Sequence, residues 1–114
     1  VLREAESLAT HALSAGVQRN RIILDPGIGF GMTPQQNLDI LRDLAAFKKL
    51  GYPILLGTSR KSFIGHYLQK EVDRRLMGTA ATVTTGIVNG VDIIRIHDVQ
   101  YLADVIRMTD LICR

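Results

Sequence analysis

One stretch constrains the fold more than any other, because an apolar run leads directly into an acid and a glycine-rich loop. The run is Ile22-Ile23-Leu24, and the loop is Asp25-Pro26-Gly27-Ile28-Gly29-Phe30-Gly31. Since the run does not alternate polar and apolar residues, it predicts a central strand of a parallel sheet, covered on both faces. Proline fixes the backbone after the strand, and the glycines allow sharp turns or close approach to a ligand. The stretch therefore indicates a site at the end of a buried strand, with a simple turn cap at Asp25 as the alternative.

Two further apolar runs follow, and each also ends in polar residues. They are residues 53–57, followed by Thr58-Ser59-Arg60-Lys61-Ser62, and the stretch Ile93-Ile94-Arg95-Ile96-His97-Asp98. The three strands begin near residues 22, 54 and 93, and each gap contains a helical pattern, which predicts an α/β fold with right-handed crossovers. Parallel strands bring their carboxyl ends to one rim. We therefore expect Asp25, Lys61 and Arg95 to share that rim.

The helical patterns cover residues 1–15, 34–49, 62–68, 76–89 and a last segment from 99 onward. Gly16 and Gly51 end the first two, and Thr33, Pro34 and Gln36 predict a capping box at the start of the second. Asp98 is placed to cap the last helix. The predicted buried stripes are Leu38, Leu41, Leu44 and Ala45 in the second helix, Val83, Ile87 and Val88 in the fourth, and Val99, Leu102, Val105, Ile106 and Thr109 in the last.

Composition restricts the class of protein. With 46% hydrophobic and 22% charged residues, residues 1–114 predict a single globular domain, and no apolar run approaches the length that crosses a bilayer. A net charge of +3 with scattered Lys and Arg residues gives no basis for nucleic-acid binding. The single cysteine, Cys113, excludes an internal disulfide framework and fits a cytoplasmic location. The sequence starts directly in a helical pattern, as if in mid-domain.

Together the motifs Leu24–Gly31, Gly57–Ser62 and Arg95–Asp98, in this order and spacing, resemble the C-terminal part of bacterial dihydropteroate synthase. The resemblance implies a (β/α)8 TIM-barrel fold of which this chain holds only the last three strands and their helices, a partial barrel. A full barrel needs about 31 residues per unit, so 114 residues supply between three and four units. The family condenses 4-aminobenzoate with (7,8-dihydropterin-6-yl)methyl diphosphate, giving 7,8-dihydropteroate and diphosphate.

The resemblance also implies roles for four residues at the ring-binding part of the site. Asp25 is similar to the acid that accepts paired N–H bonds from the pterin edge. Lys61 is similar to the catalytic lysine that donates to the pterin, with a plain surface lysine as the alternative. Phe30 and Ser62 resemble residues that meet the ring and the carboxylate of 4-aminobenzoate. For Phe30 an apolar loop anchor remains open, and for Ser62 a simple helix N-cap.

Arg95 and His97 alternate along their strand, so they point to one face and can bind one anion. The resemblance assigns both, as catalytic residues, to the diphosphate, where two cationic donors would stabilise the charge that develops as the C–O bond breaks. A structural histidine is the alternative for His97. Ser59 and Arg60 match the Gly57–Ser62 motif, but only their position in it suggests that they act in the site. His11 and His66 have no such context.

Further properties follow from the resemblance alone. It implies Mg²⁺ with its protein ligand in the half of the family domain that this sequence does not contain, a homodimer in the full-length protein, and sulfonamides as competitors. We therefore expect no metal ligand in this chain and no turnover by it alone. Two alternatives stay open: a methyltetrahydrofolate-binding barrel that serves a corrinoid methyltransferase, and a non-catalytic partner half. A dinucleotide loop is disfavoured, because the glycine spacing is not G-x-G-x-x-G.

Overall fold

The three predicted strands lie side by side and run parallel. The computed structural model describes residues 1–114, with β1 (Leu55–Leu56) paired to β2 (Ile93–Ile94) in the register Leu55 to Ile93 and Leu56 to Ile94. On the other side of β1, Leu24 forms a single parallel bridge to Ile54. The order is therefore Leu24, β1, β2, and the prediction that residues 22–24 form the central strand is wrong. They form an edge, because they have a neighbour on one side only, and Ile23 is 53% exposed.

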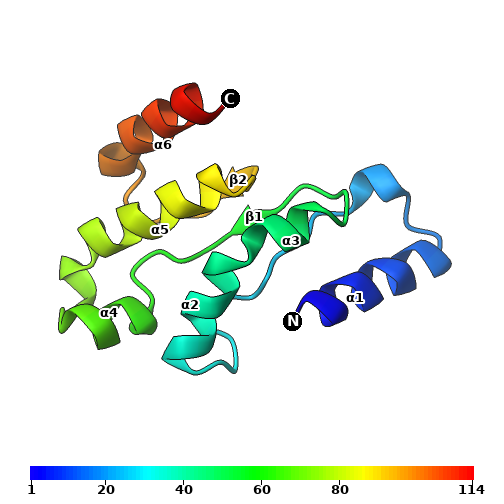
Figure 1. The fold of residues 1–114 in the computed structure, drawn as a ribbon, viewed down its shortest axis with the longest axis horizontal. Coiled ribbons are helices and arrows are strands. Elements are labelled where there is room, and N and C mark those ends of the chain that lie inside the picture. Colours follow the sequence, from blue (N-terminus) through cyan, green and yellow to red (C-terminus); the bar gives the residue numbers. More distant parts are fainter.

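Helices alternate with these strands along the chain, which confirms the α/β class (Figure 1). The helices are α1 (Leu2–Ser14), α2 (Pro34–Arg42), α3 (Leu44–Lys48), α4 (Ser62–Leu68), α5 (Leu76–Val88) and α6 (Val99–Cys113), with short 3-10 turns at Arg19–Arg21 and Val72–Arg74. In Figure 1, α1 and α6 lie apart from each other, while α2, α3 and β1 occupy the middle. No helix is long and apolar enough to cross a membrane.

The start of α2 is fixed by the predicted capping box. The Thr33 hydroxyl accepts a hydrogen bond from the Gln36 N–H at 3.2 Å, and the Thr33 N–H donates to the Gln36 side chain at 2.9 Å. The helix does not continue to residue 49 as predicted, because the backbone leaves helical geometry at Asp43 and separates α2 from α3. This break turns Leu44 and Phe47 into the core, where each is almost fully buried, and leaves Ala45 exposed.

The inner face of α5 combines small residues with the larger apolar side chains of Val83 and Ile87, which are buried as predicted. A Cβ at Gly86 would lie 2.5 Å from the Leu56 side chain, and one at Gly78 would lie 2.4 Å from Ile64 on α4. These glycines therefore permit the close helix packing that the sequence predicts. Val88 of α5 and Val99 of α6 are both well exposed, so the prediction that they belong to the buried stripes is wrong.

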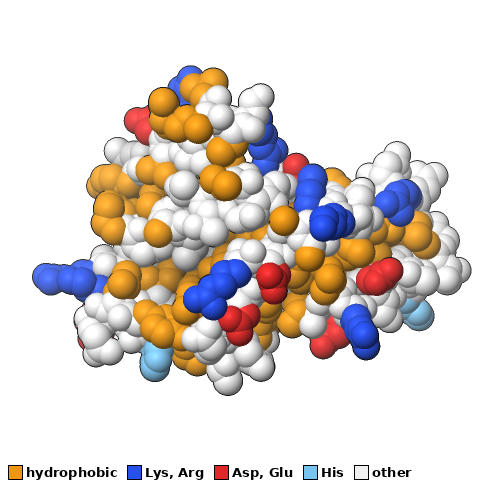
Figure 2. Space-filling model, in the orientation of Figure 1, with side chains coloured by type: hydrophobic (Ala, Val, Ile, Leu, Met, Phe, Trp, Pro, Cys, Tyr) orange, Lys and Arg blue, Asp and Glu red, His pale blue; other side chains and the backbone are white.

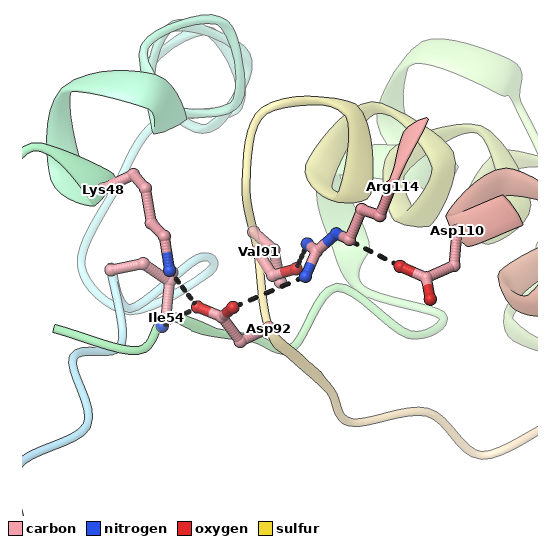
Figure 3. A network of polar contacts seen from close by, with 6 residues as sticks. All are labelled: Lys48, Ile54, Val91, Asp92, Asp110 and Arg114. Atoms are coloured by element: carbon pink, nitrogen blue, oxygen red, sulfur yellow. Dashed lines mark hydrogen bonds and ion pairs between the residues drawn. The ribbon is translucent and has the colours of Figure 1, made fainter. Parts of the chain in front are cut away.

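A polar network anchors the amino ends of β1 and β2 (Figure 3). The Asp92 carboxylate accepts from the Ile54 N–H at 3.0 Å and from the Lys48 ammonium at 2.7 Å, and it pairs with Arg114 at 3.5 Å. Arg114 also pairs with Asp110 at 3.1 Å. The network thus ties the end of α3 and Arg114 to the amino ends of the strands. The glycine-rich loop follows the opposite, carboxyl end of the parallel segments.

The hydrophobic core lies around β1 and the inner faces of α2 and α3, where Leu44, Ile54 and Leu56 are fully buried. On the visible face of the molecule, hydrophobic side chains also gather over α6, at the top of the view (Figure 2). The exposed apolar residues of α6 are Val99, Tyr101, Met108, Leu111 and Ile112.

Candidate active site

The glycine-rich loop after Leu24 is held by side chains on both of its flanks. The Asp25 carboxylate accepts from the Gly27 N–H at 2.8 Å, so the turn cap weighed as an alternative is present. The Gly29 N–H donates to the side chain of Asn37 at 2.8 Å, and Asn37 is only 3% exposed. Phe30, at the tip, is 75% exposed. The loop therefore presents an acid and an aromatic ring on a fixed backbone.

Lys61 reaches this loop from the segment after β1. Its ammonium donates to the carbonyl oxygen of Ile28 and lies 4.9 Å from the centre of the Phe30 ring, a cation–π distance. Burial lowers the pKa of Lys61 below its usual value; the Asp25 carboxylate opposes this, and the Arg95 guanidinium adds to it. Lys61 thus lies within electrostatic reach of both Asp25 and Arg95, so it is not a plain surface lysine.

Arg95 and His97 follow β2 and face the same small hollow as Lys61. This anion-sized pocket has a volume of about 80 Å³, and its lining is Gly57, Ser59, Lys61, Arg95, Ile96 and His97. Arg95 and His97 thus line one pocket, as expected for residues that bind one anion, and Ile96 between them lines it as well. Three nitrogen donors on so small a hollow favour an anion with several oxygen atoms.

A second hollow has a volume of about 550 Å³. It is lined by Asp25, Phe30 and Met32 of the loop together with residues of α1 and α2, among them Ala5 and Ile40. Its mixed acidic and apolar lining suits a flat heterocycle better than an anion. The structure therefore brings Asp25 and Phe30 to one hollow and Arg95 and His97 to the next, with Lys61 close to both.

Ser62 stands apart from these residues. It is the first residue of α4, it is exposed, and it lines neither hollow. Lys61 occupies the N-cap position, and no side chain caps this helix. The simple N-cap alternative for Ser62 is therefore wrong.

Ser59 contacts His97 directly, which the sequence did not reveal. Its hydroxyl accepts from the His97 backbone N–H at 3.0 Å and lies 2.7 Å from the ring nitrogen Nδ1. The strands Leu55–Leu56 and Ile93–Ile94 pair at an offset of 38 residues, and Ser59 and His97 have the same offset. The strand register thus continues into the site as side-chain contacts.

Arg60 continues the same series with Asp98. Its guanidinium binds the Asp98 carboxylate through Nη2 at 2.6 Å and Nε at 3.1 Å and holds the pKa of that carboxyl below its usual range. Arg60 has a left-handed backbone with φ of 56°, which is uncommon for a residue other than glycine. Asp98 does occupy the N-cap position of α6, but its side chain does not cap the helix as predicted, because it binds Arg60.

Helix α5 holds the backbone of this loop. The Arg60 N–H donates to the Thr79 hydroxyl at 3.1 Å, and Arg75 donates to the Arg60 carbonyl oxygen at 2.9 Å. Thr79 is fully buried, and the Thr58 hydroxyl lies 2.7 Å from that of Thr82. The small polar residues of α5 therefore fix the geometry of the site.

The donor set of the site does not fit Mg²⁺. This ion prefers carboxylate, carbonyl and water oxygens in octahedral geometry, whereas the anion pocket presents an ammonium, a guanidinium and an imidazole. No group of three or more His, Cys, Asp or Glu side chains lies close enough together to hold a metal ion. The residues of this chain thus do not by themselves make the magnesium site that the resemblance implies.

The chain is similar in sequence and fold to several dihydropteroate synthases. The dihydropteroate synthase of Clostridium beijerinckii is 48% identical over all of this chain, which covers 43% of that protein. The Clostridium difficile dihydropteroate synthase, solved in the presence of pteroic acid, is 49% identical with a TM-score of 0.92 over all of this chain and 45% of its own. The Thermus thermophilus enzyme in complex with 4-aminobenzoate is 35% identical with a TM-score of 0.89, over 96% of this chain and 43% of its own.

The chain thus spans less than half the length of the curated relatives and solved structures that it matches. The model of the family described as pterin binding enzyme matches residues 1–97, most of the chain. On this match, and on the shared fold, the chain belongs to the pterin binding enzyme family.

Proposed function

We propose that this chain carries the pterin and diphosphate side of a dihydropteroate synthase site. In this reaction the amine nitrogen of 4-aminobenzoate forms a bond to the methylene carbon of the dihydropterin. The C–O bond to diphosphate breaks, diphosphate leaves with the bonding electrons, and the amine loses a proton. The observation that carries the proposal is the position of Lys61, which lines the anion pocket and lies 4.9 Å from the ring of Phe30 in the lining of the other hollow.

Asp25 and Lys61 are proposed to bind the pterin ring. A carboxylate accepts paired N–H bonds from an amino-pyrimidinone edge, and an ammonium donates to the ring's oxygen and nitrogen acceptors. Asp25 already accepts from Gly27, which orients the carboxylate at the end of the strand. The lowered pKa of Lys61 reflects its burial, so its hydrogen bonds form where water competes less.

Arg95 and His97 are proposed to hold the diphosphate as the C–O bond breaks. Their nitrogen donors face the same hollow of about 80 Å³, so the negative charge that accumulates on the leaving oxygen meets fixed donors. Phe30 is proposed to pack on the 4-aminobenzoate ring, since its ring is exposed beside the glycine loop. Ser62, at the start of α4, is proposed to meet the carboxylate of that substrate.

Two features of the fold support related proposals, on the barrel and on a homodimer. We propose that the parallel segments at Leu24, β1 and β2 correspond to the last three strands of an eight-stranded barrel. The exposed apolar residues of α6 support a homodimer. We further propose a cytoplasmic folate enzyme that uses Mg²⁺ held by residues outside this chain, has no nucleic-acid partner, and binds sulfonamides in competition with 4-aminobenzoate.

The test is steady-state kinetics of the full-length protein with each substrate varied in turn. We expect Arg95→Ala to raise the KM for the dihydropterin diphosphate about 10- to 100-fold, because a charged hydrogen bond contributes about 1.5–3 kcal/mol. The KM for 4-aminobenzoate should change little. Lys49→Ala, which removes an exposed cation away from the site, should leave both unchanged.

The alternative reading has a distinct result. A methyltetrahydrofolate-binding barrel would bind methyltetrahydrofolate and form no dihydropteroate from the two substrates. The similar proteins reported above are dihydropteroate synthases, which does not favour this alternative. Absence of product with the wild-type protein would overturn the proposed function.

A further inference from the structure

We propose that Ser59 is a positioning residue that fixes the ring tautomer of His97. In this arrangement the serine hydroxyl donates to Nδ1, so the imidazole is neutral and carries its proton on Nε2. His97 then offers the anion pocket an N–H donor without adding a third positive charge. The identity of the anion as a diphosphate group rests on the proposed function, whereas the Ser59–His97 contact does not.

The direction of the hydrogen bonds follows from counting protons. A serine hydroxyl has one proton and two lone pairs. A backbone N–H can only donate, so the 3.0 Å contact from the His97 N–H to the Ser59 oxygen uses a lone pair. The structure gives the Ser59 hydroxyl one other partner, the Nδ1 atom at 2.7 Å. If Nδ1–H donated instead, the second lone pair would be used and the hydroxyl proton would have no partner among the contacts of Ser59, so we infer that the hydroxyl donates to an unprotonated Nδ1.

The neighbouring cations favour the same assignment. Lys61 and Arg95 line the pocket that His97 faces. An imidazolium there would place a third positive charge beside an ammonium and a guanidinium before any anion arrives. The Asp98 carboxylate interacts electrostatically with His97, but it is already paired with Arg60 through two hydrogen bonds. A neutral ring with its proton on Nε2 avoids the repulsion between the cations and still donates a hydrogen bond.

Ser59 is held where it can impose this choice. Its side chain is 7% exposed, which leaves little room for other rotamers. The residue before it, Thr58, bonds to Thr82 on α5, and the residue after it, Arg60, binds Asp98 through two nitrogen atoms. The backbone on both sides of Ser59 is thus fixed, and its hydroxyl keeps its place opposite His97.

The first test measures the tautomer itself. Long-range ¹H–¹⁵N correlation spectra of the full-length protein, without substrate, distinguish a protonated ring nitrogen from an unprotonated one. We expect the neutral His97 ring to carry its proton on Nε2 in the wild-type protein and in Ser59→Thr, which keeps the hydroxyl. Ser59→Ala should give a mixture of tautomers. A proton on Nδ1 in the wild-type protein, or an unchanged spectrum in Ser59→Ala, would overturn the proposal.

The second test measures binding of inorganic diphosphate by calorimetry and requires no turnover. We expect Ser59→Ala to weaken diphosphate binding roughly two- to tenfold, because the apparent affinity falls in proportion to the fraction of His97 that still presents Nε2–H. Ser59→Thr should restore the affinity, and Ser7→Ala, an exposed serine on α1, should not change it. Equal affinity of Ser59→Ala and wild type, with equal thermal midpoints, would overturn the proposal. A protein that passes both tests yet forms no dihydropteroate would instead refute the proposed function.

Discussion

The guanidinium of Arg60 and the carboxylate of Asp98 meet side by side, through one contact of 2.6 Å and one of 3.1 Å. The two residues have the same offset of 38 positions as the paired residues of β1 and β2. The Asp98 side chain is 14% exposed, while that of Arg60 is 37% exposed. The pair thus fixes the segment that carries Lys61 relative to the one that carries Arg95 and His97.

Replacing Arg60 by lysine should loosen this connection while keeping the charge. A lysine cannot make two parallel bonds to one carboxylate, so we expect Arg60→Lys to raise the KM for the dihydropterin diphosphate about tenfold with little change for 4-aminobenzoate. The matched control is Arg42→Lys, since Arg42 pairs with Asp39 on the exposed face of α2. Equal kinetics of Arg60→Lys and Arg42→Lys would show that the pair does not position the site.

A comparison of alanine variants at two loop glycines can distinguish the effect of backbone strain from the effect of displacing Lys61. Gly29 has φ of 88°, and a Cβ there would lie 3.1 Å from the Lys61 side chain; Gly31 has φ of 65° and open space around it. Alanine at either position should lower the free energy of unfolding by about 1–2 kcal/mol, because an L-residue is strained in this region. We expect only Gly29→Ala also to weaken pterin binding, as measured by titration with pteroic acid. Equal pteroic acid affinity in the two variants would contradict the assigned place of Lys61.

Asn37 supports the loop from inside the molecule. Its side chain accepts from the Gly29 N–H at 2.8 Å and donates to the Thr33 carbonyl oxygen at 3.2 Å. We expect Asn37→Ala to lower the free energy of unfolding by about 1–3 kcal/mol in urea titrations, because it removes two hydrogen bonds of a buried side chain, each contributing about 0.5–1.5 kcal/mol. Gln35→Ala removes an exposed amide from the same helix and should cost less than about 0.5 kcal/mol. A similar cost for both variants would mean that Asn37 does not hold the loop.

Local signals in the sequence were sufficient for most helices. Thr33 and Gln36 predict the start of α2 because a capping box involves only neighbouring residues. The break at Asp43 was not predictable in this way, because the core selects it by burying Leu44 and Phe47. Likewise, the apolar run Ile22–Leu24 reads as a covered strand, but whether a strand is central depends on its neighbours and not on its own residues.

The general location of the candidate site was predictable from the sequence. Parallel strands bring their carboxyl ends to one rim, so the approach of Lys61 to both Arg95 and the Asp25 loop followed from the parallel direction of the strands. The contact of Ser59 with His97 depends on which residues of β1 and β2 face each other, and a register is a long-range property. Asp98 shows what neighbouring residues alone cannot predict. It occupies the N-cap position of α6 as expected, but its side chain binds Arg60 instead of the helix backbone.

Asp92, at the amino ends of the strands, should make the free energy of unfolding depend on pH in the acid range (Figure 3). Burial acts to raise the pKa of Asp92, but hydrogen bonds from Lys48 and the Ile54 N–H, together with the charges of Lys48 and Arg114, bring it below its usual value. A carboxyl with a lowered folded-state pKa stabilises the fold above its unfolded pKa of about 3.9, and this stabilisation is lost as the pH falls toward the folded value. We therefore expect Asp92→Asn to lower the free energy of unfolding by about 1–3 kcal/mol at pH 7.

The difference in unfolding free energy between Asp92→Asn and wild type should shrink between pH 4 and pH 2, roughly the range in which a carboxyl with a lowered pKa titrates. Urea titrations across this range are the measurement, with Asp104→Asn on the exposed face of α6 as the matched control; a difference from wild type that stays constant with pH would contradict the assigned role of the carboxylate.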